Sequence, residues 1–213
     1  MDARLQHPFT ALICGPTQSG KTEFVKRLLM EKDAMIFPSP EHIVWCYGEF
    51  QPAHMELNSK IPGIRFVEGI PTDLDGMFSP NCTNLLIIDD LMLETGNDKR
   101  ITNLFTKGSH HRNLSVLLIL QNLFHNGREI RTMSLNSHYL VLFKNPRDRS
   151  QITHLAKQMY PGHTTFIQEA FVDATHDPYG YLLIDLKPNT PEVLRLRTKI
   201  FPGETAYVYV RKT

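Results

Sequence analysis

Cysteine is scarce in this sequence, and no two cysteines have the spacing that binds zinc or forms a redox motif. Cys14, Cys46 and Cys82 are its three cysteines, and none belongs to a C-x-x-C pair. A disulfide framework and a zinc ribbon are therefore excluded. The ten histidines show no H-E-x-x-H spacing either. We expect reduced thiols that fill small core positions, as in an intracellular protein.

Long apolar runs and a charge excess are also absent. The longest purely aliphatic run covers residues 116–120, far too short to span a bilayer. The first residues include Asp2 and Arg4 rather than an apolar signal segment. We therefore expect a soluble intracellular protein without a membrane partner. The net charge of +1 excludes a bulk polycationic binder, so any nucleic-acid surface must be a local patch.

The length and the even composition favour one domain. A chain of 213 residues suits a single α/β domain with a sizeable core. No internal repeat, low-complexity tract or long linker divides it. We predict one domain over residues 1–213, with its core at about 9–186 and a β-rich C-terminal extension at about 187–213.

A glycine-rich segment dominates what is present. It fits G-x-x-x-x-G-K-[ST], the phosphate-binding loop or Walker A motif. Its glycines let the backbone curl until its N–H groups point at phosphates. Its lysine can reach the β- and γ-phosphates, and the threonine hydroxyl can ligate Mg²⁺. The residues are Gly15, Pro16, Thr17, Gln18, Ser19, Gly20, Lys21 and Thr22.

The flanking segments agree with this interpretation. Residues Phe9–Cys14 indicate a short buried strand, and Lys21–Lys32 indicate a helix with Phe24, Leu28 and Leu29 on one face. A strand, a glycine loop and a helix N-terminus together form an anion site. ATP and Mg²⁺ are the expected ligands. The alternative is a plain glycine turn, which this context disfavours.

A second segment places two carboxylates at the end of an apolar run. Residues Asn84–Asp90 predict a fully buried strand that ends in Asp89 and Asp90. Open α/β sheets bind ligands at the carboxyl ends of their strands. Asp89 would hold Mg²⁺ through water as a Walker B aspartate, and Asp90 would polarise the attacking water.

A third segment ends in a carboxamide. Residues Ser115–Leu120 predict another buried strand, and Gln121 follows it. A glutamine there could sense the γ-phosphate and orient water, as glutamines do in other phosphoryl-transfer enzymes. A cap or turn residue is the alternative for Gln121.

The remaining pattern predicts alternating strands and helices. We predict an α/β P-loop NTPase fold of the RecA and FtsK–HerA type, with a mainly parallel central sheet flanked by helices and a short antiparallel C-terminal extension. The further strands are expected at His42–Tyr47, Ile64–Val67 (an edge strand), His138–Phe143 and Tyr181–Asp185, and the further helices at Asp98–Lys107, 145–160 and Thr165–Val172.

The C-terminal extension carries alternating positive charges. Arg195, Arg197 and Lys199 would share one face if Val193–Ile200 were one extended strand. Such a face could contact a DNA phosphate backbone or an acidic neighbouring subunit. The alternative is an edge strand that charge protects from aggregation.

These segments, in this order, resemble one known family. They are similar to the genome-packaging ATPases of large DNA viruses, adintoviruses and Maverick/Polinton elements, within the FtsK–HerA superfamily of ring-forming DNA pumps. The resemblance covers about residues 9–199. It is carried by Gly15–Thr22, Leu85–Asp90, Arg112, Leu117–Gln121, Leu120–Phe124, Phe143–Arg147 and Pro178–Asp185.

The resemblance implies a role for each matched residue. Lys21 and Thr22 would bind the nucleotide and Mg²⁺, Asp89 and Asp90 would be the Walker B pair, and Gln121 would be the sensor. Arg112 would be a finger that reaches the ATP of the next subunit. Many members have glutamate at the position of Asp90, which leaves the catalytic base open between Asp90 and the more remote Glu94.

The resemblance also implies partners and a place. It implies a homo-oligomeric ring around double-stranded DNA, capsid proteins as further partners, and a location in the host-cell cytoplasm or nucleus or on the assembling virion. Two other functions stay open. A nucleotide or metabolite kinase could use Arg147 and Arg149 as a lid, and an assembly scaffold would bind ATP without turnover. A regulatory GTPase is disfavoured because no N-K-x-D sequence is present.

Overall fold

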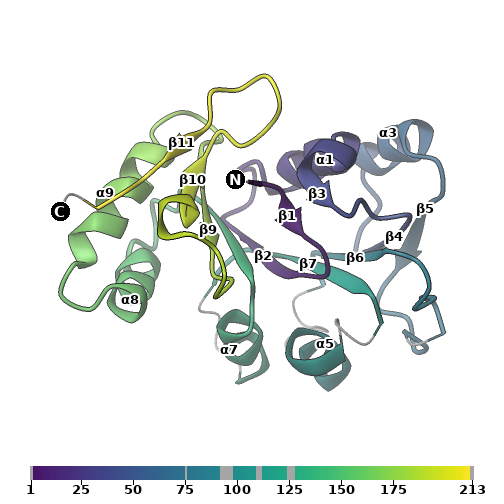
Figure 1. Cartoon of the computed structure of the whole chain (residues 1–213). Helices are drawn as coiled ribbons and strands as arrows, with labels where there is room; N and C mark the ends of the chain where they lie inside the picture. The colour runs from purple at the N-terminus through teal and green to yellow at the C-terminus, as the bar shows by residue number, and fades with distance from the viewer. Residues whose placement is uncertain (1, 75, 92–97, 109–111, 124–127, 212–213) are drawn as a thin grey trace.

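The central element of the fold is a nine-stranded sheet with the strand order β11-β10-β9-β8-β2-β7-β6-β4-β5 (Figure 1). The computed structural model describes residues 2–74, 76–91, 98–108, 112–123 and 128–211. The strands are β2 (Thr10–Cys14), β4 (His42–Tyr47), β5 (Ile64–Glu68), β6 (Asn84–Asp89), β7 (Leu114–Leu120), β8 (Tyr139–Phe143), β9 (Tyr181–Asp185), β10 (Leu196–Thr198) and β11 (Tyr207–Val208).

The six strands from β8 to β5 are parallel, as expected. Strand β7 lies between β2 and β6, with Cys14 opposite Leu120 and Asp89 opposite Ile119. The segments after β2, β6 and β7 therefore leave the sheet at the same edge. Each of these strands is buried along its whole length, which explains their apolar runs.

Helices cover both faces of the sheet (Figure 1). One face packs on α1 (Lys21–Met30) and α3 (Pro52–Lys60), and the other packs on the remaining large helices. Along β7, Leu117 and Ile119 face the α1 side, whereas Val116 and Leu118 face the other. The remaining helices are α2 (Lys32–Met35), α5 (Lys99–Asn103), α7 (Arg128–Leu135), α8 (Ser150–Met159) and α9 (Thr164–Ala174).

The C-terminal part of the sheet is antiparallel. Strand β9 pairs antiparallel with β8, β10 with β9, and β11 with β10. The predicted antiparallel extension is thus confirmed, but its predicted first strand is too long. Residues Glu192–Leu194 form a 3-10 helix, and Arg195 has helical backbone angles. Only Leu196–Thr198 is extended.

Two helix boundaries differ from the predictions. The helix expected from residue 145 begins at Ser150, because the side chains of Asn145 and Asp148 accept hydrogen bonds from nearby backbone N–H groups and hold a turn. The helix expected at Asp98–Lys107 is α5 followed by a π-helical turn at Leu104–Gly108.

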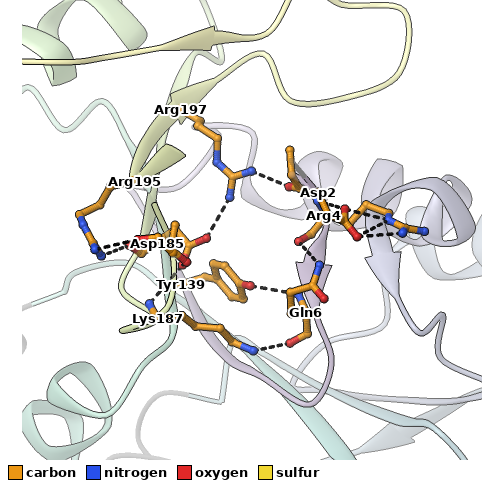
Figure 2. A network of polar contacts seen from close by, with 10 residues as sticks. Asp2, Arg4, Gln6, Tyr139, Asp185, Lys187, Arg195 and Arg197 are labelled. Carbon is orange, nitrogen blue, oxygen red and sulfur yellow. Dashed lines mark hydrogen bonds and ion pairs between the residues drawn. The ribbon is translucent and has the colours of Figure 1, made fainter. Parts of the chain in front are cut away.

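A small parallel sheet of β1 (Leu5–Gln6) and β3 (Ile36–Phe37) was not predicted. A polar network ties the start of the chain to β9 and β10 (Figure 2). The Tyr139 hydroxyl accepts a hydrogen bond from the Gln6 N–H at 3.0 Å, and the Lys187 Nζ donates to the Gln6 carbonyl at 2.6 Å. Arg197 donates to the Ala3 carbonyl and pairs with Asp185. The first residues are therefore held by several direct hydrogen bonds.

The same network overturns the predicted basic face. Arg197 is 3% exposed and faces the interior, whereas Lys199 is exposed and forms an ion pair with Asp177. The Arg195 guanidinium donates to the backbone carbonyl of Asp185 and pairs with Glu192. The expectation of three cations on one face is wrong, because the segment is a short turn and strand rather than one extended run.

Within the described ranges, no helix is both long and apolar enough to cross a membrane.

Candidate nucleotide site

The glycine-rich loop connects β2 to α1 at the carboxyl edge of the sheet. The Gly15 N–H donates to the Leu120 carbonyl at 3.2 Å, which joins the start of the loop to the end of β7. A Cβ at Gly15 would lie 2.6 Å from the Ser19 Oγ and 2.7 Å from the Phe143 Cβ, so no larger residue fits. Gly20 has a φ of 104°, which L side chains rarely adopt. Neighbouring side chains therefore require glycine at position 15, and the backbone conformation requires it at position 20.

Lys21 lies at the start of α1 and folds back over the loop. Its Nζ donates to the carbonyls of Gly15 at 2.7 Å and Pro16 at 2.8 Å. Burial lowers the pKa of this ammonium, and the nearby carboxylates, Asp89 chief among them, oppose that shift. A half-buried ammonium whose hydrogen-bond partners among the described residues are two backbone carbonyls is well placed to exchange them for phosphate oxygens, because a charged acceptor bonds more strongly.

A cavity of about 490 Å³ opens beside the loop. It brings together predicted residues from three separate segments: Lys21 and Thr22 from α1, Asp89 and Asp90 from the end of β6, and Gln121 from the end of β7. The parallel order of β2, β7 and β6 explains this meeting, because it aligns their carboxyl ends. Thr17, Gln18 and Gly20 of the loop also line the cavity.

The two carboxylates at the end of β6 have different environments. Asp89 is 5% exposed. Burial, and then the negative charge of Asp90, raise its pKa to about 6, although Lys21 opposes the shift. Asp90 is exposed and has a φ of 55°, the left-handed region. The chain therefore turns sharply after Asp89, and Asp90 lies at the mouth of the cavity rather than in the sheet.

The donor set of this cavity fits Mg²⁺ and a polyphosphate. Mg²⁺ is usually held by one or two carboxylates together with phosphate oxygens and water, and the cavity offers Asp89 and the Thr22 hydroxyl. The Ser19 Oγ of the loop is buried and has no hydrogen-bond partner among the described residues, but Ser19 does not line the cavity, so the fit rests on Asp89, Thr22 and the loop. No cluster of three or more histidine, cysteine, aspartate or glutamate side chains suited to a metal occurs in the described part of the chain.

Arg112 lies away from this cavity. It lies two residues before the start of β7, whose seven residues end at the Gln121 side of the sheet. At about 3.3 Å per residue, that strand separates Arg112 from Gln121 by about 20 Å. Near Arg112, the Asn84 side chain donates to its backbone carbonyl at 3.3 Å. Arg112 is therefore at the amino edge of the sheet, so it does not reach the Lys21 cavity of its own chain.

Other residues at the cavity were not predicted. Gln51 and Ala53, at the start of α3, line it, as does Tyr179 in the turn between α9 and β9. Of these three residues, only Tyr179 had a signal in the sequence. It lies in Pro178–Asp185, a segment of the family resemblance to which no function was assigned. The exposed side chains of Arg147 and Arg149, the suggested kinase lid, are not among the cavity's lining residues. Glu94, the other possible base, lies outside the described residues.

Comparisons with known proteins show the fold. No protein-family model matches the sequence, and no curated protein matches it. Among solved structures, the genome packaging NTPase B204 of Sulfolobus turreted icosahedral virus 2, in complex with AMP, is similar with a TM-score of 0.54 and 13% identity, over 94% of this chain and 98% of that chain. B204 of Sulfolobus turreted icosahedral virus, described as a DNA-packaging ATPase, gives a TM-score of 0.56 and 11% identity, over 96% and 98%.

A second kind of protein has a similar domain. The cytoplasmic domain of the Thermomonospora curvata type VII secretion ATPase EccC gives a TM-score of 0.54 and 13% identity. The match covers 92% of this chain but only 26% of that chain. The chain therefore has the α/β fold, with a mostly parallel sheet and flanking helices, of these P-loop ATPases.

Proposed function

We propose that this protein is an ATPase whose hydrolysis of ATP drives double-stranded DNA into a capsid. One observation carries the enzymatic part of the proposal. A single cavity collects the phosphate loop, Lys21, Thr22, two carboxylates and a glutamine. These residue types are the ones that phosphoryl transfer needs, because the reaction depends on positioning and charge neutralisation more than on covalent chemistry.

Each residue has a defined task in this proposal. The loop N–H groups and the Lys21 ammonium bind the β- and γ-phosphates. Thr22 and Asp89 hold Mg²⁺, which would neutralise charge on the phosphates when bound. Asp90 accepts a hydrogen bond from the attacking water at the cavity mouth. Gln121 orients that water or contacts the γ-phosphate from the strand between the loop and the carboxylates.

The packaging part of the proposal rests on likeness. B204, which has a similar fold over almost the full length of both chains, is described as a DNA-packaging ATPase. The motif order in this sequence resembles the adintovirus and Maverick/Polinton packaging ATPases, and we assign the protein to such an element. The proposal includes a homo-oligomeric ring around DNA, capsid proteins as partners, and action inside the host cell. The similar fold of EccC, a type VII secretion ATPase, makes a secretion motor the second candidate function.

An ATPase assay with and without double-stranded DNA, together with the mass of the protein in solution, tests this function. We expect Mg²⁺-dependent turnover that DNA stimulates and that accompanies a ring-sized oligomer. Lys21→Ala should remove turnover, because the γ-phosphate loses its cation. Lys32→Ala, which changes an α2 lysine paired with Asp33, is the matched control and should keep it.

The possible outcomes separate the alternatives. Undiminished turnover in Lys21→Ala would refute the site. ATP binding without turnover in the wild type would favour the assembly scaffold. Turnover by a monomer or dimer that ignores DNA would favour a kinase or another small-substrate enzyme, and a screen of phosphate acceptors would then follow.

A further inference from the structure

A second cavity, of about 870 Å³, lies directly beyond the phosphate loop. Its walls come from α1, the turn before β9, and the segment from β10 to β11. Gly20, Glu23 and Tyr179 line both this cavity and the phosphate cavity, so the two spaces meet at the end of the loop. Its size is in the range of pockets that hold small organic ligands. We call it the aromatic cleft.

The floor of the aromatic cleft is a cluster of four aromatic side chains. Phe24 of α1 contacts Phe143, Tyr181 and Phe201 edge to face, with ring centroids 6.1, 4.8 and 5.1 Å apart. All four are largely buried. Tyr207 also lines the cleft and is 52% exposed. An apolar, aromatic surface of this kind suits a flat ring system, because rings stack or pack edge to face at low cost.

The charges of the aromatic cleft argue against a phosphate there. Its two permanently cationic side chains have carboxylate partners: Arg27 pairs with Glu204 at 2.6 Å, and Lys199 pairs with Asp177 at 3.4 Å. Asp173 adds another carboxylate, which accepts a hydrogen bond from the Tyr209 hydroxyl. An anion would meet no unpaired Arg or Lys among the described lining residues. The cleft is therefore suited to the uncharged part of a ligand whose phosphates lie at Lys21.

Tyr179 stands where the two cavities meet, in an unusual conformation. The Gly180 N–H donates to the Asp177 carbonyl at 3.0 Å, which closes a turn with Pro178 second and Tyr179 third. Tyr179 has a φ of 62°, and a positive φ at the third position of a turn after proline normally belongs to glycine or asparagine. Its side chain is 71% exposed, so packing in the core does not account for the strain.

The Tyr179 ring lies against the phosphate loop. A Cβ built on Gly20 would be 3.2 Å from the Tyr179 Cδ1 and 3.3 Å from its Cβ. The turn thus holds an exposed aromatic ring at the end of the loop, next to the place where the phosphate chain of a nucleotide would continue into its nucleoside. Strained residues of this kind cluster at ligand clamps.

We propose that the aromatic cleft binds the nucleoside of the nucleotide and that the Tyr179 ring stacks on its base. The proposal rests on the proposed ATPase function and assigns the part of the ligand that the phosphate loop does not touch. Stacking of a base on an aromatic side chain is tolerant of sequence, since every base has a π-face. Tyr179 would then raise affinity for nucleotides in general, and selection among bases would lie with the polar rim of the cleft.

The test compares ATP with inorganic tripolyphosphate, both with Mg²⁺, by calorimetry on the full chain. Tripolyphosphate engages the phosphate loop but has no base. Tyr179→Gly removes the ring and also relieves the positive φ, so the variant should fold at least as stably as the wild type. Tyr179→Phe keeps the ring. Phe37→Ala removes an exposed ring on β3, outside both cavities, and is the control.

We expect Tyr179→Gly to weaken ATP binding by roughly 5- to 100-fold, the usual loss for one stacked base, and to leave tripolyphosphate binding unchanged. Tyr179→Phe and Phe37→Ala should bind both ligands as the wild type does. Equal ATP affinity in Tyr179→Gly and wild type would overturn the base subsite while leaving the ATPase intact. A wild type that binds tripolyphosphate as tightly as ATP would also overturn it. A wild type that binds neither ligand would refute the proposed function itself.

Discussion

Arg197 and Asp185 form an ion pair inside the C-terminal part of the sheet. The Arg197 Nη2 lies 3.2 Å from the Asp185 Oδ2, and the two side chains are 4% and 7% exposed. Asp185 also accepts hydrogen bonds from the Thr190 hydroxyl and the Lys187 N–H. Figure 2 shows how this pair lies between β9, β10 and the first residues of the chain. Because Arg197 also donates to the Ala3 carbonyl, it joins the C-terminal strands to the start of the chain.

Arg197→Ala should lower the free energy of unfolding by about 3–5 kcal/mol, because removal of one partner leaves a buried charge uncompensated. Urea unfolding at pH 7 measures the change. The matched control is Lys199→Ala, two residues along, whose exposed pairing with Asp177 should contribute far less. Similar midpoints for the wild type and Arg197→Ala would contradict a stabilising role for the pair.

This pair also shows where prediction from the sequence failed. Alternation of Leu196 and Arg197 is typical of a strand whose polar face is exposed to solvent. The pattern cannot reveal that the face of β10 that carries Arg197 is covered. The partners of Arg197 there are the carbonyl of Ala3, almost the full length of the sequence away, and the carboxylate of Asp185. Burial of Arg197 depends on that distant pairing, which no local pattern contains.

The meeting of the glycine-rich loop with Asp89 and Gln121 at one cavity was predicted far better, because its signals are local. A buried parallel strand needs a continuous apolar run, and Leu85–Ile88 and Val116–Leu120 supply one each. The polar residues that follow must then leave the sheet at its carboxyl edge, so Asp89 and Gln121 meet at the loop. Tyr179 had no such signal, since its place at the cavity depends on a turn after α9 and on β9 running antiparallel to β8.

The buried Asp89 carboxyl predicts an unusual dependence of stability on pH. Its pKa is raised from an ordinary 3.8 to about 6, mainly by burial. Between these values the folded protein holds more protons than the unfolded chain, so stability falls as pH rises from about 4 to 6. A shift of this size corresponds to roughly 2–3 kcal/mol. Asp89→Asn should therefore be more stable than the wild type at pH 7, and the difference should vanish near pH 4.

Unfolding by urea between pH 4 and 7 measures this effect, and Asp98→Asn is the control of opposite sign. A hydrogen bond from the Arg100 side chain lowers the pKa of Asp98, so its contribution to stability is present above the ordinary pKa and is lost as pH falls. Asp98→Asn should therefore lose stability at pH 7 and nearly as much at pH 4, because the contribution of Asp98 disappears only when the pH falls below its ordinary pKa of 3.8 and through the lowered folded pKa. If Asp89→Asn were less stable than the wild type at pH 7, the carboxylate would have partners in the folded state that compensate for its burial.

Asp90→Asn should leave ATP binding almost intact but slow hydrolysis by about two to three orders of magnitude. A side chain that polarises the attacking water stabilises the transition state more than the bound substrate. Calorimetry with a non-hydrolysable ATP analogue and steady-state turnover separate the two effects. Asp90→Gly is a useful companion, because glycine suits the φ of 55° at this position, and it should show the same loss without strain. Equal losses of binding and turnover would instead make Asp90 a metal or structural residue.

The last prediction concerns Arg112, which lies at the amino edge of the sheet, one strand length from the cavity of its own chain. We expect Arg112→Ala to bind ATP normally but to hydrolyse it at least about 10³-fold more slowly, the size of effect that an arginine finger supplies. The guanidinium is always charged and its planar fork matches phosphate oxygens. A normal rate in this variant would make Arg112 a surface residue with no part in catalysis.

Mixed oligomers decide whether Arg112 acts on a neighbouring subunit. Lys21→Ala and Arg112→Ala should each be inactive alone. In a mixed ring, an Arg112→Ala subunit still has its own Lys21, and a Lys21→Ala neighbour can offer it an intact Arg112. Part of the activity should therefore return on mixing, and its dependence on the mixing ratio should follow the fraction of unlike neighbours. Mixtures that stay inactive, although their measured mass shows that both variants share one ring, would mean that Arg112 does not complete a neighbour's site.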